Sequence, residues 1–107
     1  MHISGTLVSD SDRRIKDNIT VLPECLGNID TINGYSFTRT DLEDKTKRHI
    51  GVLAQEVEVK YPELVMETQE VKSVNYSGLC GVLIQCVKEL KEQNAILSKR
   101  IDALENK

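Results

Sequence analysis

Ser11 and Lys16 are the residues of this sequence whose types and spacing best suit catalysis. A neutral lysine amine can take the proton of a serine hydroxyl, as in serine–lysine variants of hydrolytic catalysis. The ordinary pKa of lysine is about 10.4, so the amine acts as a base at neutral pH only where desolvation or nearby cations disfavour the ammonium form. Arg13 and Arg14 are cations near enough in sequence to help. The spacing permits contact between the two side chains in a turn, and it fits an ordinary polar turn as well.

Other catalytic patterns are missing from the sequence. It contains no GxSxG, HExxH or Walker glycine loop. His2 and His49 lie far apart, and His49 is expected to be structural or exposed. Three cysteines without a CxxC pair are expected to be buried small side chains, not disulfide partners or zinc ligands: Cys25, Cys80 and Cys86. No cofactor and no metal site are predicted.

The length, composition and net charge of the chain limit the size of the fold and the kinds of partner it can have. The chain has 107 residues, which predicts one small domain, and its formal charge of -3 argues against nucleic acid as the main partner. No apolar run approaches the roughly 20 residues of a membrane span, so no membrane partner is expected. Tryptophan is absent and aromatic residues make up 4% of the chain. Such a thin core favours oligomerisation, which adds burial.

The elements that must position Ser11 and Lys16 are short. Residues 12–19 are interpreted as a short helical turn or an extended link, and Pro23 is expected to open a short helix over residues 24–29 with an early stop at Gly27. Alternating apolar residues predict strands over residues 34–40 and 49–53, joined by a charged turn over residues 41–47. A helix is predicted over residues 54–61, where Pro62 ends it, and two further strands are predicted over residues 64–68 and 71–76.

Residues 77–107 are predicted to form one long helix with a heptad repeat. Leucines recur every seven residues at position d, and a second set at position a comprises Cys80, Val87, Asn94 and Ile101. The predicted oligomerisation residues are Leu83, Val87, Leu90, Asn94, Leu97, Ile101 and Leu104. Arg100 at g and Glu105 at the next e can pair between chains, and Asn94 would fix the register. These a and d residues suit a dimer in isolation, although the globular part can impose another number.

Three blocks in this order resemble the peptidase S74 family, the intramolecular chaperone domain of phage endosialidases. Residues 11–19 (SDRRIKDNI) resemble its opening signature, and residues 51–57 (GVLAQEV) resemble its central block. Pro62 and Val65 follow at the expected distance, and residues 74–76 lead into the leucine-rich helix. The likeness spans residues 7–107.

The resemblance implies a fold and a function. The fold would be α+β, with a small antiparallel sheet and short helices followed by a long C-terminal helix that forms a homotrimeric coiled coil. Residues 1–10 would be the end of an upstream shaft and the cleavage linker, residues 11–78 the chaperone and autoprotease region, and residues 79–107 the trimerisation helix. The domain would assist folding of an upstream phage fibre or spike and then release itself by autoproteolysis.

The resemblance also implies roles for individual residues. Ser11 matches the nucleophile, Lys16 the general base, and Asp12 and Asn18 positions that orient the site. The Ser-Asp pair is duplicated, but Ser9 would reach Arg14, which stays protonated and cannot be a base. Cleavage is expected between Asp10 and Ser11, with the other side of Ser11 as second choice.

The resemblance further implies that this domain would act in the host cytoplasm during virion assembly and would be released from the mature virion after cleavage. Some relatives carry long arms that embrace the shaft, whereas residues 41–47 are short here. Two other functions compete with this one. The first is a trimerisation module without protease activity. The second is a bZIP-like DNA binder, which is disfavoured because residues 71–81 hold a single lysine and two glycines where a basic helix is required.

Overall fold

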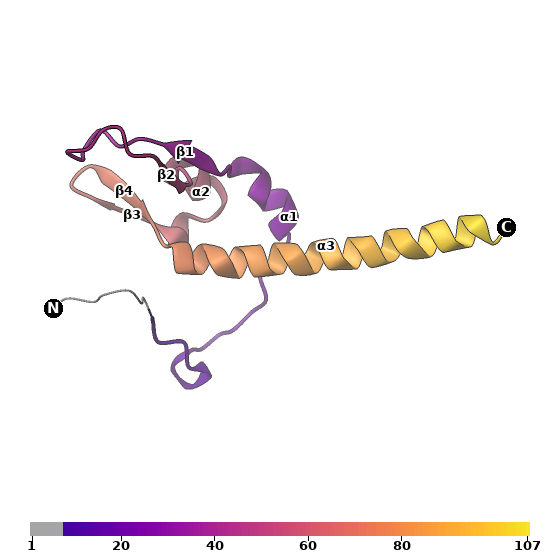
Figure 1. Cartoon of the computed structure of the whole chain (residues 1–107). Helices are drawn as coiled ribbons and strands as arrows, with labels where there is room; N and C mark the ends of the chain where they lie inside the picture. Colours follow the sequence, from indigo (N-terminus) through magenta and orange to yellow (C-terminus); the bar gives the residue numbers. More distant parts are fainter. Residues whose placement is uncertain (1–7) are drawn as a thin grey trace.

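The computed structural model of the 107-residue chain describes residues 8–107. A long helix, α3, forms one end of the molecule, and a small α+β body covers one side of its N-terminal half (Figure 1). We call residues 8–24 the strap and residues 25–75 the body. The strap lies on the side of α3 opposite to the body, and the C-terminal half of α3 projects beyond both (Figure 1). No described helix is both long and apolar enough to cross a membrane.

The strap contains one turn of 3-10 helix, η1 (Arg13–Ile15), between extended segments. Residues 12–19 therefore hold both predicted alternatives, a helical turn followed by an extended link. Every residue from Val8 to Glu24 is exposed. The strap adds nothing to the buried core, so its shape depends on its own local hydrogen bonds.

The body begins with α1 (Cys25–Asn28) and the 3-10 turn η2 (Ile29–Thr31). The predicted helix is confirmed, but its start and stop were wrong. Pro23 lies before the N-cap residue Glu24, whose φ of 56° is left-handed, so proline is not the first helical residue. Gly27 lies inside the helix. Helix α1 ends where its last turn tightens into the 3-10 turn η2, in which the Ile32 amide donates a hydrogen bond to the Ile29 carbonyl.

The first hairpin pairs β1 (Tyr35–Phe37) with β2 (His49–Gly51) in antiparallel register. Residues 41–47 are exposed and join the strands, which confirms the solvated charged turn. His49 stacks on Phe37 with ring centroids 5.9 Å apart, a structural role. A Cβ atom at Gly51 would lie 2.7 Å from the Tyr76 hydroxyl, so a larger residue there would require the Tyr76 side chain to shift.

Helix α2 (Ala54–Lys60) and the 3-10 turn η3 (Pro62–Leu64) lead into a second hairpin, β3 (Val65–Thr68) and β4 (Val71–Val74). The two residues between these strands have positive φ, as a two-residue hairpin turn requires. The predicted single small sheet was wrong: the strands form two separate two-stranded sheets. The chain between β2 and β3 folds into α2 and η3, and β3 and β4 contact α2 instead of the first hairpin.

Helix α3 (Tyr76–Glu105) confirms the predicted long helix, and Asn75 caps its start by accepting a hydrogen bond from the Gly78 amide. Leu79, Val82 and Cys86 are its buried residues. They pack in one core with Cys25, Val57 and Tyr61. The predicted burial is thus confirmed for Cys25 and Cys86 but wrong for Cys80, which is exposed because it lies on another face of the helix.

Candidate active site

Ser11 and Lys16 meet in the strap. The Lys16 Nζ atom donates a hydrogen bond to the Ser11 Oγ atom at 2.7 Å. The turn η1 brings them together, because the Ile15 amide bonds to the Asp12 carbonyl and the Lys16 amide bonds to the Arg13 carbonyl, both at 3.1 Å. If the amine is neutral, the same contact can run the other way, with the hydroxyl donating to nitrogen. The arrangement is therefore suited to proton transfer from serine to lysine.

Asp12 holds the turn that separates the pair. Its carboxylate caps η1 by accepting a hydrogen bond from the Arg14 amide at 2.8 Å. The same carboxylate accepts hydrogen bonds from the Arg14 guanidinium, with 2.8 Å between Arg14 Nη2 and Asp12 Oδ2. These bonds, first the side-chain bond and then the backbone bond, lower the pKa of Asp12 below its ordinary value. Arg14 is thus engaged by Asp12, so its expected help to Lys16 is offset by that carboxylate.

Asn18 turns the chain after Lys16. Its φ of 53° is left-handed, a conformation that asparagine adopts more readily than most residues. Its amide donates to the Asp17 side chain at 2.9 Å. Asn18 touches neither Ser11 nor Lys16 in the hydrogen bonds described. Any influence on the pair therefore runs through the path of the backbone.

The site stands open in the single chain. Among the described residues, the hydrogen bonds of residues 8–21 all join strap residues no more than five positions apart. No donor from the described part of the body reaches the Ser11 hydroxyl. The strap also exposes several apolar side chains, among them Ile15 and Ile19. The geometry places a hydroxyl and an amine in contact, and no described hydrogen bond from the body reaches either of them.

Glu89 is a positioning residue that the sequence did not indicate. Its carboxylate, on α3, accepts hydrogen bonds from the amides of Cys25 at 2.7 Å and Leu26 at 3.2 Å. Amides at the start of a helix lack partners within the helix, so this carboxylate caps α1. The Glu89 contact attaches the junction between the strap and the body to α3. The partners are 64 positions apart, and a glutamate on a charged helix gives no sequence signal of such a contact.

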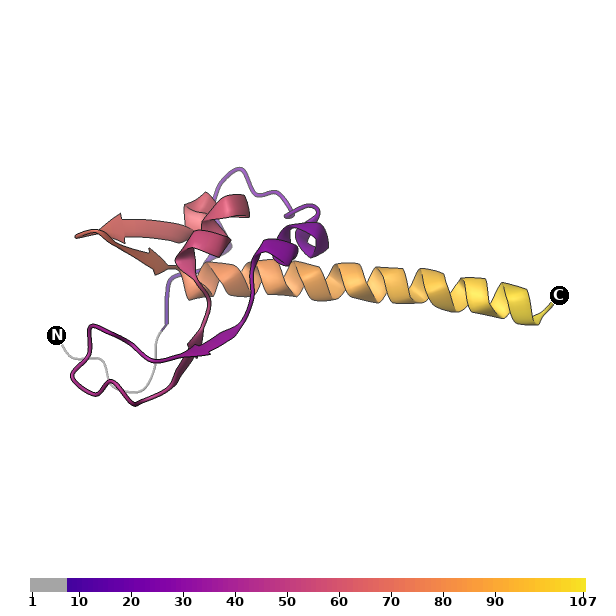
Figure 2. The ribbon, with the colours of Figure 1, turned by 90° about the horizontal axis from the view of Figure 1, so that it is seen from above.

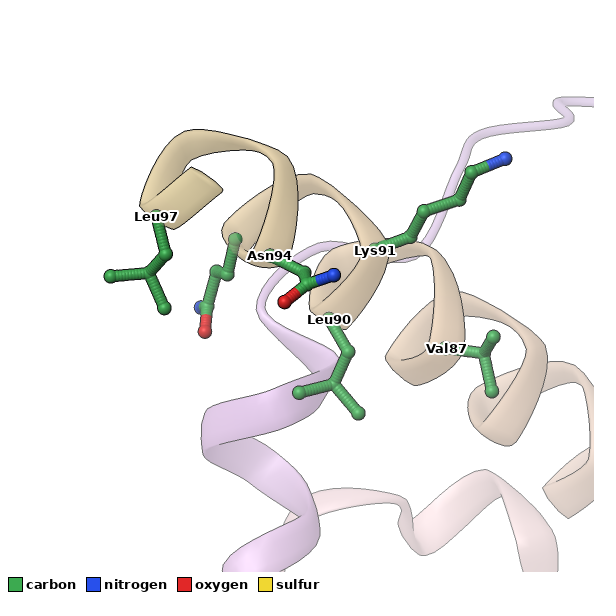
Figure 3. A pocket seen from close by; sticks show the side chains of 6 residues that line it. Val87, Leu90, Lys91, Asn94 and Leu97 are labelled. Carbon is green, nitrogen blue, oxygen red and sulfur yellow. The ribbon is translucent and has the colours of Figure 1, made fainter. Parts of the chain in front are cut away.

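The heptad residues form an exposed apolar stripe on α3, which we call the seam. The four leucines at d are 46% to 65% exposed, so the body does not cover them. In Figure 3, Leu90, Asn94 and Leu97 point to one side of the helix, whereas Lys91 points away. The body packs on Leu79, Val82 and Cys86 of α3 instead of on this stripe.

No three His, Cys, Asp or Glu side chains of residues 8–107 gather where they could hold a metal ion. The reactive groups of the strap are the hydroxyl and the amine.

The family of the chain follows from comparison with known proteins. The model of the peptidase S74 family, described as the chaperone of endosialidase, matches residues 11–66, which is over half of the chain. The chain belongs to the chaperone of endosialidase family. The match begins at Ser11 and ends in β3, so it takes in the open site of the strap and most of the body.

A relative of this chaperone of endosialidase domain is the long tail fiber protein Gp37 of Salmonella phage S16. The two are 29% identical over 105 residues, which cover 90% of this chain. The chain spans only 14% of the length of that relative. The likeness extends beyond the family match into the long helix, because it covers nearly the whole chain.

Proposed function

We propose that this chain assists the folding of a phage fibre as an intramolecular chaperone, assembles as a trimer through α3, and releases itself by cleavage next to Ser11. The observation that carries the catalytic part is the 2.7 Å contact between Lys16 Nζ and Ser11 Oγ, at the first residues of the family match. The family and the tail-fibre relative support the chaperone part. Such a chain would act in the host cytoplasm during assembly and would be absent from the mature virion.

In the proposed reaction, the Ser11 Oγ atom attacks the carbonyl carbon of Asp10 while Lys16 takes the hydroxyl proton. The bond between the Asp10 carbonyl carbon and the Ser11 nitrogen breaks, and Lys16 returns the proton to the leaving amine. The product is an ester between Asp10 and the Ser11 hydroxyl. One water molecule then hydrolyses that ester, leaving a carboxyl group on Asp10 and a free amine and hydroxyl on Ser11. The upstream residues 1–10 would depart with the shaft.

Two roles support this reaction without touching the reacting atoms. Asp12 would hold the turn that brings Lys16 back to Ser11, and Asn18 would direct the chain away after the turn. Both are positioning residues in this proposal. Residues 11–78 would then form the chaperone and protease region, with the helix from residue 79 onward reserved for assembly.

Trimer formation follows from the uncovered seam. An apolar stripe spanning four heptads is stable in water only when other helices cover it. Asn94 would contribute to register, and the flanking Arg100 and Glu105 would pair between chains. The number three comes from the family, because the a and d residues alone suit a dimer.

The test is mass spectrometry of the purified protein. We expect a product beginning at Ser11, and we expect none from Ser11→Ala or Lys16→Ala. The matched control is Ser9→Ala, which alters the duplicated Ser-Asp pair and should leave cleavage unchanged. An intact mass with no cleavage product in any of the four proteins, the unsubstituted chain included, would contradict the autoprotease.

The second candidate is a trimerisation module without protease activity. The open position of Ser11 and Lys16 in the single chain favours it, because no described residue of the body covers the pair. Light scattering that shows a trimer, together with intact masses after long incubation, would establish this candidate.

A further inference from the structure

Asn33 and Gly34 form an asparagine–glycine pair that the fold does not use as a turn. Such a pair is a common signal of a tight hairpin turn, in which both residues adopt positive φ. Here the pair lies in the link between η2 and β1, and Figure 2 shows the chain run from the short helices into β1 without a reversal. Neither residue has a left-handed φ. The backbone conformation therefore gives no reason for glycine at position 34.

The pair is chemically reactive and accessible. The backbone nitrogen that follows an asparagine can attack the side-chain amide, and glycine has no Cβ atom to obstruct the ring that forms. No other asparagine of the sequence precedes a glycine. Both residues are exposed, and nothing lies within 4 Å of the place that a Cβ atom of Gly34 would take. The described hydrogen bonds outside helices and strands include none from the Gly34 amide, so its nitrogen is available.

The side chain of Asn33 lies against Glu56 of α2. The Glu56 Oε1 atom accepts a hydrogen bond from the Asn33 backbone amide at 3.2 Å, and the Asn33 side-chain amide lies 3.5 Å from the same oxygen. A contact of 3.5 Å is too long to hold that amide firmly. The other oxygen, Oε2, accepts a hydrogen bond from the Tyr35 hydroxyl at 2.7 Å. One carboxylate thus ties the chain on both sides of Gly34 to α2.

We propose that Asn33 is a site of spontaneous deamidation, and that the carboxylate formed there releases the start of β1 from Glu56. Hydroxide removes the proton of the Gly34 amide, and the nitrogen bonds to the Asn33 Cγ atom. The bond between Cγ and Nδ2 breaks, and ammonia leaves with a proton from water. One water molecule then opens the cyclic imide. Opening at Cγ gives aspartate, and opening at the backbone carbonyl gives isoaspartate. The reaction needs only water, so it depends on neither trimer formation nor cleavage.

Either product places a negative charge beside the Glu56 carboxylate. Like charges this close repel each other, and an ionised carboxylate cannot donate a hydrogen bond as the amide does. Isoaspartate also lengthens the backbone by one methylene group just before β1, which moves Tyr35 relative to its acceptor. The first hairpin therefore loosens from α2 in chains that have reacted.

Peptide mapping by mass spectrometry tests the site. The purified chain is incubated in mildly alkaline buffer and digested, and fragment ions report which asparagine has exchanged ammonia for water. We expect conversion at Asn33 and an intact amide at Asn18, which is also exposed but precedes the branched residue Ile19. Conversion at Asn33 that is no faster than at Asn18 would overturn the proposal.

Gly34→Ala is the matched variant for the reaction. Its Cβ atom would meet nothing within 4 Å, so the fold should be kept. The methyl group obstructs ring closure, and we expect conversion of Asn33 to slow at least about fivefold, which corresponds to about 1 kcal/mol of activation free energy. Equal rates in the natural chain and in Gly34→Ala would overturn the cyclic route.

A double-mutant cycle tests the consequence for the fold. Asn33→Asp supplies one product directly and should lower the melting temperature by about 2–5 °C at a fixed protein concentration. In a Glu56→Gln background, which removes the facing charge, the same substitution should cause less than half of that shift. Equal shifts in both backgrounds, or no shift in the natural one, would overturn the release of β1 from Glu56.

Discussion

The Asp12 carboxylate stabilises the turn between Ser11 and Lys16. It accepts hydrogen bonds from both the Arg14 amide and the Arg14 guanidinium, so it caps η1 and forms an ion pair with Arg14. The turn spans the residues between the nucleophile and the base. Because all of these groups are exposed, the conformation of the turn depends on such local bonds.

Substitutions at Asp12 should distinguish the effect of its capping hydrogen bond from the effect of its charge. Asp12→Ala removes the acceptor for the Arg14 amide, and we expect cleavage to slow several-fold, because the Ser11–Lys16 contact is formed less often. Asp12→Asn keeps a capping oxygen and should retain most of the rate. The measurement is a time course of the Ser11 product by mass spectrometry. Equal slowing by both variants would show that the charge matters and the cap does not.

The pH dependence of this cap has a definite sign. The pKa of Asp12 is lowered in the folded chain, chiefly by the Arg14 side chain. The contribution of the carboxylate is therefore fully present above the ordinary aspartate pKa and is lost as the pH falls through the lowered value. The turn is intact at neutral pH, and any change in cleavage between pH 6 and 9 belongs to another group.

At the scale of elements, the body is joined to α3 by polar and apolar contacts at the same place. Cys25 is fully buried in the core with Val82 and Cys86, and its amide bonds to Glu89 one turn further along α3. The first helix of the body is short, so it depends on this anchor more than on its own hydrogen bonds. The strap leaves the body at this anchor.

Glu89→Ala should therefore destabilise the body. It leaves two amide donors of α1 without their acceptor, a loss that typically costs about 1–3 kcal/mol. We expect a lower melting temperature by circular dichroism and slower cleavage, since the strap loses its fixed origin. Glu89→Gln keeps one acceptor oxygen, so its melting temperature and cleavage rate should lie between those of the natural chain and those of Glu89→Ala. Glu92→Ala, at the outward position f of the same helix, is the control and should change neither measurement.

At the scale of the whole molecule, the chain is elongated, with extents of 65 × 41 × 28 Å, and its uncovered seam runs along the long axis. Half of α3 has no body beside it (Figure 1). In the proposed trimer, such a helix would gain its burial from other copies.

Cys80 can report the alignment of the chains. It is exposed in the single chain and occupies the first a position of the seam, so a parallel in-register assembly brings the Cys80 thiols of neighbours together. Mild oxidation should give a covalent dimer on a non-reducing gel, because a disulfide joins two of three chains. Cys80→Ser should abolish this band.

Cys86→Ala is the control and should keep the covalent dimer. Burial raises the pKa of the Cys86 thiol, and a protonated thiol oxidises slowly. An oligomer that gives no covalent dimer on oxidation would contradict the parallel in-register alignment.

The amino-acid sequence by itself determined the features that depend on neighbours a few positions apart. Heptad spacing predicted α3, alternation and turn residues predicted the four strands, and the spacing of Ser11 and Lys16 allowed a turn between them. These features were predictable because hydrogen bonds within a turn, a helix or a hairpin join nearby residues.

Only the tertiary structure decided which faces meet. The division into two sheets, the body packed at position g, and the Glu89 cap on α1 all join residues far apart in the chain. Several faces of α3 are apolar enough to pack against the body, and the combined burial of the whole core decides which face does so. The strap is left uncovered because the body packs on the other side of the helix.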